Sequence, residues 1–432
     1  MNFERLRTLL INQALHGRLL QSERDEQSGE EAEGYYCLPQ TWEWRTLKEM
    51  VTPTKQKVPT GQFTYIDVSS ISHFNVKDAK VLDGTEAPSR ARKIVNEGMV
   101  LFSMVRPYLK NICIASAIEG KQIASTAFAT MTCKEGLLNK YLLYVFRSDF
   151  FMECVKERQR GISYPAIGEK DFYGIKIPLP SMEEQVRIVA KLDRVFGEID
   201  RAEKAYRELQ NLSEVLRGKI LQEAIQGKLV PHLAEEGVVE QIGDVSKEVP
   251  FAIPEQWKWV RLSDLSLDMA DGPFGSNLKK EHYTSQREVR IIQLSNIGER
   301  GWRNENVKYT TFTHAETISR SRVSAGDIVI AKMMPAGRAV IVPEIEKGFV
   351  LSSDAVKVVV DKERCLTKYL NFVINSSVFK NQVYSNVQGT TRIRTSLSKL
   401  KNYLVPLPPL KEQQRIVEKV EELLKQIDRI TS

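Results

Sequence analysis

The sequence predicts an α+β protein in which two similar domains are separated by two long helices that form an antiparallel coiled coil. The first reason is a repeated string: IPLPSMEEQVRIV begins at Ile177, and VPLPPLKEQQRIV begins at Val405, 228 residues later. The second is an amphipathic pattern over 181–230, with apolar residues three, four or seven positions apart. The third is a set of short β-branched runs, separated by Gly, Pro and Asn, in the two remaining stretches.

The repeat extends well beyond this string. Residues 177–202 and 405–430 share 12 identities without a gap. The same offset of 228 pairs Ser125-Thr126-Ala127 with Ser353-Asp354-Ala355. A period of this length is too long for a solenoid repeat and is typical of a duplicated domain. We therefore predict two α+β domains of the same fold.

A second similarity follows a different offset. LRTLLINQALHGRLL, which begins at Leu6, is similar to LRGKILQEAIQGKLV, which begins at Leu216. In the middle of the chain this pattern continues a helix, whereas its other copy stands at the N-terminus. The two ends of the chain should therefore rebuild the helical unit that the centre forms continuously, which makes the architecture pseudo-twofold and circularly organised. The predicted order is an N-terminal helix over 1–22, a first domain over 35–180, a central helical region over 181–230, an acidic linker over 231–252, a second domain over 253–408 and a C-terminal helix over 409–432.

The start of the central helix is marked in the sequence. Pro178 and Pro180 end the preceding strand, and Ser181 is a good N-cap residue. Glu184, three positions later, predicts a capping box. A helix this long cannot bury its apolar stripe alone, so we expect it to pair with the terminal helices.

The charge distribution indicates a polyanionic partner. The formal net charge is +7, but 21–34 carries −5 and 231–250 carries −4, which leaves +16 on the rest of the chain. Two acidic segments within an otherwise basic chain indicate that the partner is a nucleic acid. The five cysteines are scattered without a C-x-x-C pair and are expected to be free thiols in a reducing cytoplasm. No apolar stretch is long enough for a membrane span, so no membrane partner is expected.

Catalytic signatures are missing from the sequence. It contains no phosphate-binding G-x-x-x-x-G-K-[ST] loop, no G-x-S-x-G elbow and no Cys/His cluster, so neither catalytic residues nor a metal site are predicted. The polar loops differ between the two copies, as expected of a scaffold that presents two recognition surfaces.

Several of these loops carry residues suited to DNA. DGPFGSNLKK, from Asp271, forms a tight turn with polar residues at its tip, and QGTTRIR, from Gln388, offers guanidinium groups. The equivalent of QGTTRIR in the first copy is RQRGISYPA. The candidate DNA-binding residues are Arg90, Arg92, Lys93, Arg106, Arg158, Arg160, Ser163 and Tyr164 in the first domain, and Phe274, Ser276, Asn277, Lys279, Gln293, Asn296, Arg320, Arg322, Lys332, Thr391, Arg392 and Arg394 in the second.

These motifs resemble those of one known family, the specificity subunits of type I restriction-modification systems. The resemblance is carried by LPQTWEWRTL and IPEQWKWVRL at the start of each domain, DGPFGSNLK, GTTRIR, LQEAIQGKLVP and the repeated IPLPSMEEQVRIV and VPLPPLKEQQRIV strings. It covers essentially the whole chain. The first copy has VTPTKQKVPTGQF in place of the DGPFGS loop, so contact residues do not transfer one to one between the domains.

The resemblance implies a non-catalytic subunit in which each domain recognises one half of a bipartite, asymmetric DNA site. The helices would set the spacer and dock two adenine methyltransferase subunits, and motor-nuclease subunits would complete the restriction complex. S-adenosylmethionine, ATP and Mg²⁺ would belong to those partners, with no cofactor in this chain. Two other hypotheses are a coiled-coil scaffold without DNA specificity and a stand-alone enzyme that acts on DNA.

Overall fold

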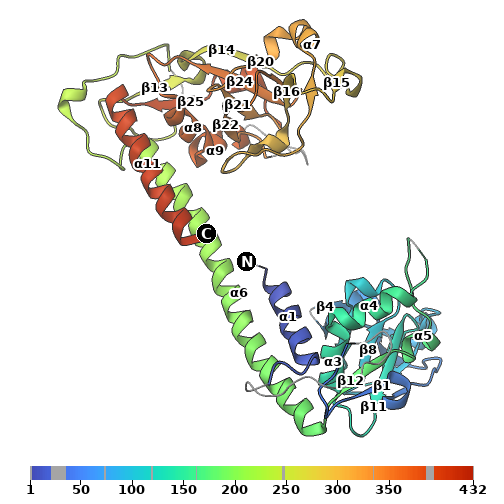
Figure 1. The fold of residues 1–432 in the computed structure, drawn as a ribbon. Helices are drawn as coiled ribbons and strands as arrows, with labels where there is room; N and C mark the ends of the chain where they lie inside the picture. Colours follow the sequence, from blue (N-terminus) through green and yellow to red (C-terminus); the bar gives the residue numbers. More distant parts are fainter. Residues whose placement is uncertain are drawn as a thin grey trace. The chain divides into compact units, whose positions relative to one another are not determined.

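The computed structural model describes residues 2–20, 36–72, 74–117, 120–161, 163–245, 249–333, 335–385 and 394–431. The chain divides into two compact units, Met1–Tyr206 and Arg207–Ser432. Each unit contains mixed helix and sheet, and α6 (Met182–Ile225) passes from the first unit into the second (Figure 1). The predicted α+β class with two repeated domains and a long helix is confirmed.

The first unit contains two four-stranded sheets and two two-stranded sheets, β1-β12 and β4-β5. One four-stranded sheet has the order β6-β3-β10-β7, with β3 and β10 parallel, and the other has the order β2-β11-β8-β9. The strands are β1 (Glu43–Thr46), β2 (Val51–Pro53), β3 (Gln62–Ile66), β4 (Ile71–Ser72), β5 (Asn75–Val76), β6 (Lys80–Asp83), β7 (Ala91–Val95), β8 (Val100–Ser103), β9 (Ile112–Ile114), β10 (Gln122–Ser125), β11 (Phe128–Cys133) and β12 (Lys176–Leu179). The helices besides α6 are α1 (Phe3–Leu15), α2 (Leu47–Met50), α3 (Asn139–Arg147), α4 (Asp149–Arg158) and α5 (Glu169–Tyr173).

The second unit repeats this plan. A sheet of order β14-β24-β21-β22 corresponds to β2-β11-β8-β9, and in the other sheet β16 and β23 form the parallel pair. The strands are β13 (Lys258–Arg261), β14 (Ser266–Asp271), β15 (Tyr283–Thr284), β16 (Val289–Ile292), β17 (Ile297–Gly298), β18 (Gly301–Trp302), β19 (Tyr309–Thr310), β20 (Arg322–Val323), β21 (Ile328–Ala331), β22 (Ala339–Ile341), β23 (Phe349–Leu351), β24 (Ala355–Val360) and β25 (Leu404–Leu407). The helices are α7 (Phe312–Thr317), α8 (Thr367–Asn375), α9 (Ser377–Ser385), α10 (Leu397–Lys401) and α11 (Leu410–Thr431).

Each unit has a core between one sheet and its helices. In the first unit the rings of Phe102 on β8, Phe146 on α3 and Phe151 on α4 lie within 5.7 Å of one another by centroid and are buried. In the second unit Ile330 and Ile374 are both fully buried in the corresponding cluster.

The terminal helices pack along α6 as predicted. In the first unit the ring of Phe3 meets that of Tyr206 edge-on at 5.9 Å, and Arg7 on α1 pairs with Asp200 at 2.5 Å. In the second unit Arg217 on α6 pairs with Asp428 on α11. The two ion pairs are equivalent under the offsets of 210 and 228, and α1 and α11 both run antiparallel to α6. This confirms the circular repeat (Figure 1).

The helix ends differ from the periodicity of the sequence. α1 ends at Leu15 and α6 at Ile225, before the HGR and QGK strings that the amphipathic pattern included. Gly17 and Gly227 have φ values of +73° and +71° and turn the chain. A Cβ on Gly227 would lie 2.5 Å from Pro254 Cγ, and one on Gly17 would lie 2.3 Å from Pro39 Cγ. Close packing against a proline therefore ends both helices.

The repeated Glu-Gln pair joins each domain to its helix. Gln185 is fully buried; its Oε1 accepts from the Leu138 backbone N–H at 2.9 Å, and its Nε2 donates to the carbonyls of Gly136 and Pro180 at 2.8 and 3.0 Å. Gln413 makes the same three bonds to Leu366, Arg364 and Pro408 at 2.8, 3.1 and 2.9 Å. The duplicated string therefore forms the same buried joint in both copies, in which the glutamine at the helix start is hydrogen-bonded to the backbone of the domain.

The glutamate of the pair has a different partner from the one predicted. Ser181 Oγ accepts from the Glu184 backbone N–H at 3.3 Å, which is one half of a capping box. The Glu184 carboxylate instead accepts from Trp42 Nε1 at 2.9 Å, and Glu412 accepts from Trp257 Nε1 at 3.0 Å. A buried indole N–H requires an acceptor, so the Trp of each domain start and the Glu of each helix start satisfy one another.

Candidate nucleic-acid interface

The loop after β14 is built as a tight, exposed turn. The Asn277 backbone N–H donates to the Phe274 carbonyl at 2.8 Å, and the Phe274 side chain is 84% exposed. A Cβ on Gly272 would lie 1.8 Å from Ser352 O, so glycine allows this close approach of two backbones. The predicted turn therefore presents its tip to solvent.

A hollow of about 540 Å³ collects many of the predicted residues of the second domain. Its lining includes Phe274, Asn277, Arg320, Lys332 and Arg394. Arg394 lies at this hollow because it forms a β-bridge with Met333. The next residue, Thr395, donates its backbone N–H to the Lys332 carbonyl at 2.9 Å. Loops that lie more than 100 residues apart in sequence thus meet at one surface.

The cations of this hollow differ in how firmly they are held. Lys332 is 8% exposed, and its Nζ donates to Asp271 Oδ1 at 2.7 Å. Arg394 is exposed and donates to Asp354 Oδ1 at 3.2 Å. Arg320 is exposed and has no hydrogen-bonding or ion-pair partner among the described residues. Arg320 and Arg394 are therefore the cations best placed to contact a phosphate or a base edge.

The first domain has a corresponding hollow of about 690 Å³. Arg90, Arg106 and Tyr164 line it, and the Arg106 guanidinium lies 4.4 Å from the centroid of the Tyr164 ring. The φ of Arg106 is +48°, an unusual backbone conformation that its N–H, bonded to the Pro165 carbonyl at 2.7 Å, helps to hold. An arginine stacked on a 68% exposed tyrosine offers both a cation and an aromatic face.

Both hollows also contain residues that sequence reasoning did not propose as contacts. Thr126 and Asp67 line the hollow of the first domain, and Ser353 lines that of the second. Thr126 and Ser353 belong to the duplicated Ser-Thr-Ala and Ser-Asp-Ala triplets. The duplication of these triplets is therefore a sequence signal for the position of both hollows.

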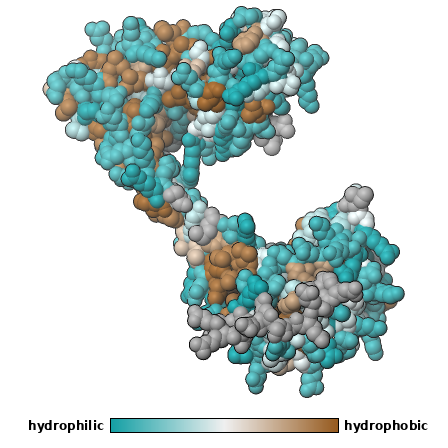
Figure 2. All heavy atoms as spheres, viewed as in Figure 1, coloured by the Kyte–Doolittle hydropathy of each residue, from teal (hydrophilic) through white to brown (hydrophobic). Residues whose placement is uncertain are grey.

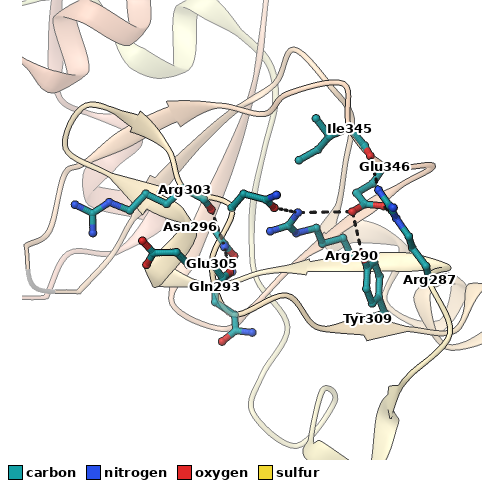
Figure 3. Close-up of polar contacts among 10 residues, drawn as sticks. Arg287, Arg290, Gln293, Asn296, Arg303, Glu305, Tyr309, Ile345 and Glu346 are labelled. Atoms are coloured by element: carbon teal, nitrogen blue, oxygen red, sulfur yellow. Dashed lines mark hydrogen bonds and ion pairs between the residues drawn. The ribbon is translucent and has the colours of Figure 1, made fainter. Parts of the chain in front are cut away.

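Besides Lys332, two predicted contact residues are buried in the fold. Lys93 is 4% exposed, and its Nζ donates to Glu169 Oε1 at 2.7 Å. Asn296 is fully buried; its amide donates to the carbonyls of Arg303 and Glu305 at 3.0 and 2.7 Å, and its Oδ1 accepts from the Gln293 N–H at 2.9 Å (Figure 3). The polar atoms of both side chains already form hydrogen bonds within the protein, so the two residues have a structural role in this fold.

A buried arginine lies beside Asn296. Arg290 is 1% exposed, donates to Asn304 Oδ1 at 2.5 Å and lies 3.6 Å from Glu346 Oε1 (Figure 3). Burial alone would raise the pKa of Glu346, but the hydrogen bonds from Arg287 and Tyr309 lower that pKa below its ordinary value. This cluster holds the loops that flank β16 and was not foreseen from the sequence.

The remaining predicted residues are at the surface but outside the two hollows. Arg92 donates to its neighbouring Ala91 carbonyl, Arg158 to the Cys154 carbonyl and Gln293 to the Asn306 carbonyl, while Arg322 pairs with Glu316. Ser276 and Lys279 are exposed on the loop whose tip lines the second hollow, and Arg160 and Ser163 are exposed next to Tyr164. Thr391 and Arg392 lie outside the described residues.

The described residues contain no metal-ligating cluster, and several thiols are buried. No cluster of three or more His, Cys, Asp or Glu side chains suited to a metal occurs in these ranges. Burial raises the pKa of the Cys113 and Cys133 thiols to about 12, which keeps them protonated at neutral pH. Within the same ranges, each helix is too short or too polar to cross a membrane.

Similar proteins share this architecture. The HsdS subunit from Thermoanaerobacter tengcongensis is 26% identical, with a TM-score of 0.55 over 93% of this chain and 94% of that one. A chain from a structural study of complex assembly and conformational transition of the type I R-M system is also 26% identical, with a TM-score of 0.73 over 92% of this chain and 93% of that one.

Sequence comparison agrees with the structural similarity. The MjaVIII specificity subunit of Methanocaldococcus jannaschii is 25% identical over 72% of this chain and 68% of its own length. The EcoAI specificity subunit of Escherichia coli is 23% identical over 93% of this chain and 80% of its own length. The model of the type I restriction modification DNA specificity domain matches twice, at 39–211 and 254–432. Because the two matches cover both repeats and most of the chain, this protein belongs to the type I restriction-modification DNA specificity family.

Proposed function

We propose that this chain is the DNA-recognition subunit of a type I restriction-modification complex and that each domain recognises one half of a bipartite, asymmetric site. The observation that carries the proposal is the pair of hollows at equivalent places in two repeated domains. Each is lined by arginine and hydrogen-bonding side chains, which suit phosphate and base-edge contacts. Different side chains in the two hollows would give two different half-sites.

The helices are proposed to set the spacer between the half-sites. α6 has 44 residues, or about 66 Å of helix at about 1.5 Å per residue. It is buttressed by α1 in one unit and by α11 in the other. Two half-sites one DNA turn apart are separated by about 34 Å. A continuous, supported helix of this length can link two domains that act on successive turns of DNA.

The same helices are proposed to dock two adenine methyltransferase subunits. Apolar side chains remain exposed on them: Leu6 and Leu9 on α1 are 42% and 50% exposed, and Leu212 and Val215 on α6 are 64% and 68% exposed. Figure 2 shows a hydrophobic patch over α1. Exposed apolar residues grouped on a helix are typical of protein interaction sites.

Catalysis is proposed to belong to the partners. The methyltransferase subunits would bind S-adenosylmethionine, and motor-nuclease subunits would bind ATP and Mg²⁺. This chain would supply the site and the geometry, with no cofactor of its own.

Mapping of methylated adenines tests the proposal directly. The chain is expressed with its methyltransferase partner in a host without other methylation, and the motif is derived from modified sites. A bipartite motif with a constant spacer is expected, together with salt-sensitive binding of a duplex that carries it. One added base pair turns one half-site by about 34° and should abolish most specific binding. A complex that binds its partners but modifies no defined motif would favour a protein scaffold. Methylation or cleavage by the purified chain alone would favour a stand-alone enzyme.

A further inference from the structure

Two histidines stack beneath the exposed loop of the second domain. His282 ends the short 3₁₀ helix Lys280–His282, and His314 lies on α7. Their ring centroids are 4.0 Å apart, and the ring planes are tilted by 22°. The chain has five histidines, and these two meet although 32 positions separate them. Each ring also bonds to the backbone of the loop Asp271–Lys280.

His282 accepts a hydrogen bond from the loop. The Lys279 backbone N–H lies 3.1 Å from His282 Nδ1. Because this partner is a donor, Nδ1 must carry the lone pair, and the proton of the neutral ring lies on Nε2. Glu281 Oε1 is 3.7 Å from that Nε2.

His314 donates a hydrogen bond to the same loop. Its Nε2 lies 2.9 Å from the Asn277 carbonyl oxygen, so Nε2 carries the proton. The backbone of His314 is held at the start of α7, because its N–H donates to Oγ1 of the N-cap residue Thr311 at 3.1 Å. The bond therefore ties the loop to a helix with a defined start.

The residue between these two bonded positions is also held. Leu278 packs against the buried cluster that contains Val289 on β16, Ala315 and Ile318 at α7 and Val350 on β23. Three consecutive residues are thus fixed: Asn277 by a hydrogen bond to its carbonyl, Leu278 by an apolar contact and Lys279 by a hydrogen bond from its backbone N–H. By contrast, Phe274 at the tip is 84% exposed.

We infer that His282 and His314 are positioning residues for base recognition by this loop. This inference rests on the proposed function. By fixing the backbone of residues 277–279, the pair orients the side chains of Asn277 and Ser276, the groups able to form hydrogen bonds to base edges. Preorganisation of such a loop improves discrimination because less conformational freedom is lost on binding.

The effect should be confined to one half-site. The first domain has VTPTKQKVPTGQF in place of this loop, and that stretch contains no histidine. The first domain therefore provides an internal control in the same molecule. A general loss of stability would affect both half-sites, whereas a positioning role affects one.

Matched substitutions separate the hydrogen bonds from the rings. His314→Ala and His282→Ala remove ring and bond. His314→Gln keeps a donor near the position of Nε2, and His282→Asn keeps an acceptor near the position of Nδ1, although both lose the stack. Each variant is expressed with the methyltransferase partner. The complex is then assayed on the mapped duplex and on duplexes with one mismatched base pair in either half-site.

In the alanine variants, discrimination against a mismatch in the half-site of the second domain should fall about fivefold to tenfold, the equivalent of one hydrogen bond. Discrimination in the other half-site should change less than about twofold, and His314→Gln and His282→Asn should retain most of it. Equal loss in both half-sites, or no loss in either, would overturn the inference. Failure of the wild-type complex to recognise any bipartite motif would instead contradict the proposed function.

Hydrogen exchange of the unsubstituted chain supplies a test that needs no variant. The Lys279 amide should exchange more slowly than the Ser276 amide at the exposed part of the loop. If both exchange at the same rate, His282 does not hold the loop and the inference fails.

Discussion

Replacement of Gln185 by leucine tests the joint between the first domain and α6. The side chain is fully buried and makes three hydrogen bonds to backbone groups, and leucine fills a similar volume without any of them. One N–H and two carbonyls lose their partner. Since an unsatisfied buried group costs about 1–3 kcal/mol, the unfolding free energy of the first unit should fall by about 3–5 kcal/mol.

The second unit and a surface residue supply the controls. Gln413→Leu removes the equivalent bonds and should destabilise the second unit by a similar amount. Gln414→Leu, next to it, removes only an exposed contact with Glu418 and should change stability by less than about 0.5 kcal/mol.

The assay must distinguish the two units, because a chain with two compact units need not unfold in one step. Hydrogen exchange followed by mass spectrometry across a urea series gives a midpoint for peptides of each unit. For Gln185→Leu, the larger shift is expected in peptides from Leu47–Arg147. A shift no larger than that of Gln414→Leu would refute the view that this residue holds the joint.

Three other predictions follow from the described contacts. Gly227→Ala should cost about 1–3 kcal/mol in thermal unfolding, because φ is +71° and the new Cβ would press on Pro254; Gly197→Ala, inside α6 with open space around it, should stabilise by about 0.5–1 kcal/mol. Arg106→Ala should weaken DNA binding by the complex at all sequences and reduce the slope of log affinity against log salt by about 1, as measured by titration at several salt concentrations; an unchanged slope would exclude a phosphate contact. The folded pKa of Glu346 is depressed, so its contribution is fully present above its unfolded pKa of about 4.3 and is lost as pH falls through the folded pKa. The stability difference between wild type and Glu346→Gln should therefore shrink on acidification below about pH 4, and a difference independent of pH would contradict this.

Local patterns predicted the architecture. The spacing of apolar residues located the helices, and the two offsets, 228 and 210, identified both the duplicated domain and its circular division between the chain ends. The helix pattern is a short-range periodicity, and the duplication is a direct similarity between two stretches of sequence, so neither depends on tertiary contacts. The ends of the helices at Leu15 and Ile225 were not located, because the glycines that follow are tolerated in a helical pattern until a proline from another segment packs against them.

The candidate interface could be predicted as loops, whereas its composition depended on tertiary structure. Arg320 and Arg394, which the sequence proposed separately, line the same hollow because a β-bridge brings Arg394 to Met333. Lys93 and Asn296 have the same residue chemistry as true contact candidates but are buried against Glu169 and the backbone of 303–305. A charge or an amide looks the same in sequence whether it faces solvent or the core.

The sequence by itself determined that this is a duplicated, circularly arranged recognition protein with a basic body and a long central helix. Only the tertiary structure decided which polar groups remain free for a partner. It also revealed that His282 and His314, dispersed in the sequence, stack and hold one loop. The physical reason is that burial and hydrogen-bond satisfaction are set by contacts between distant segments, and no periodicity along the chain encodes those contacts.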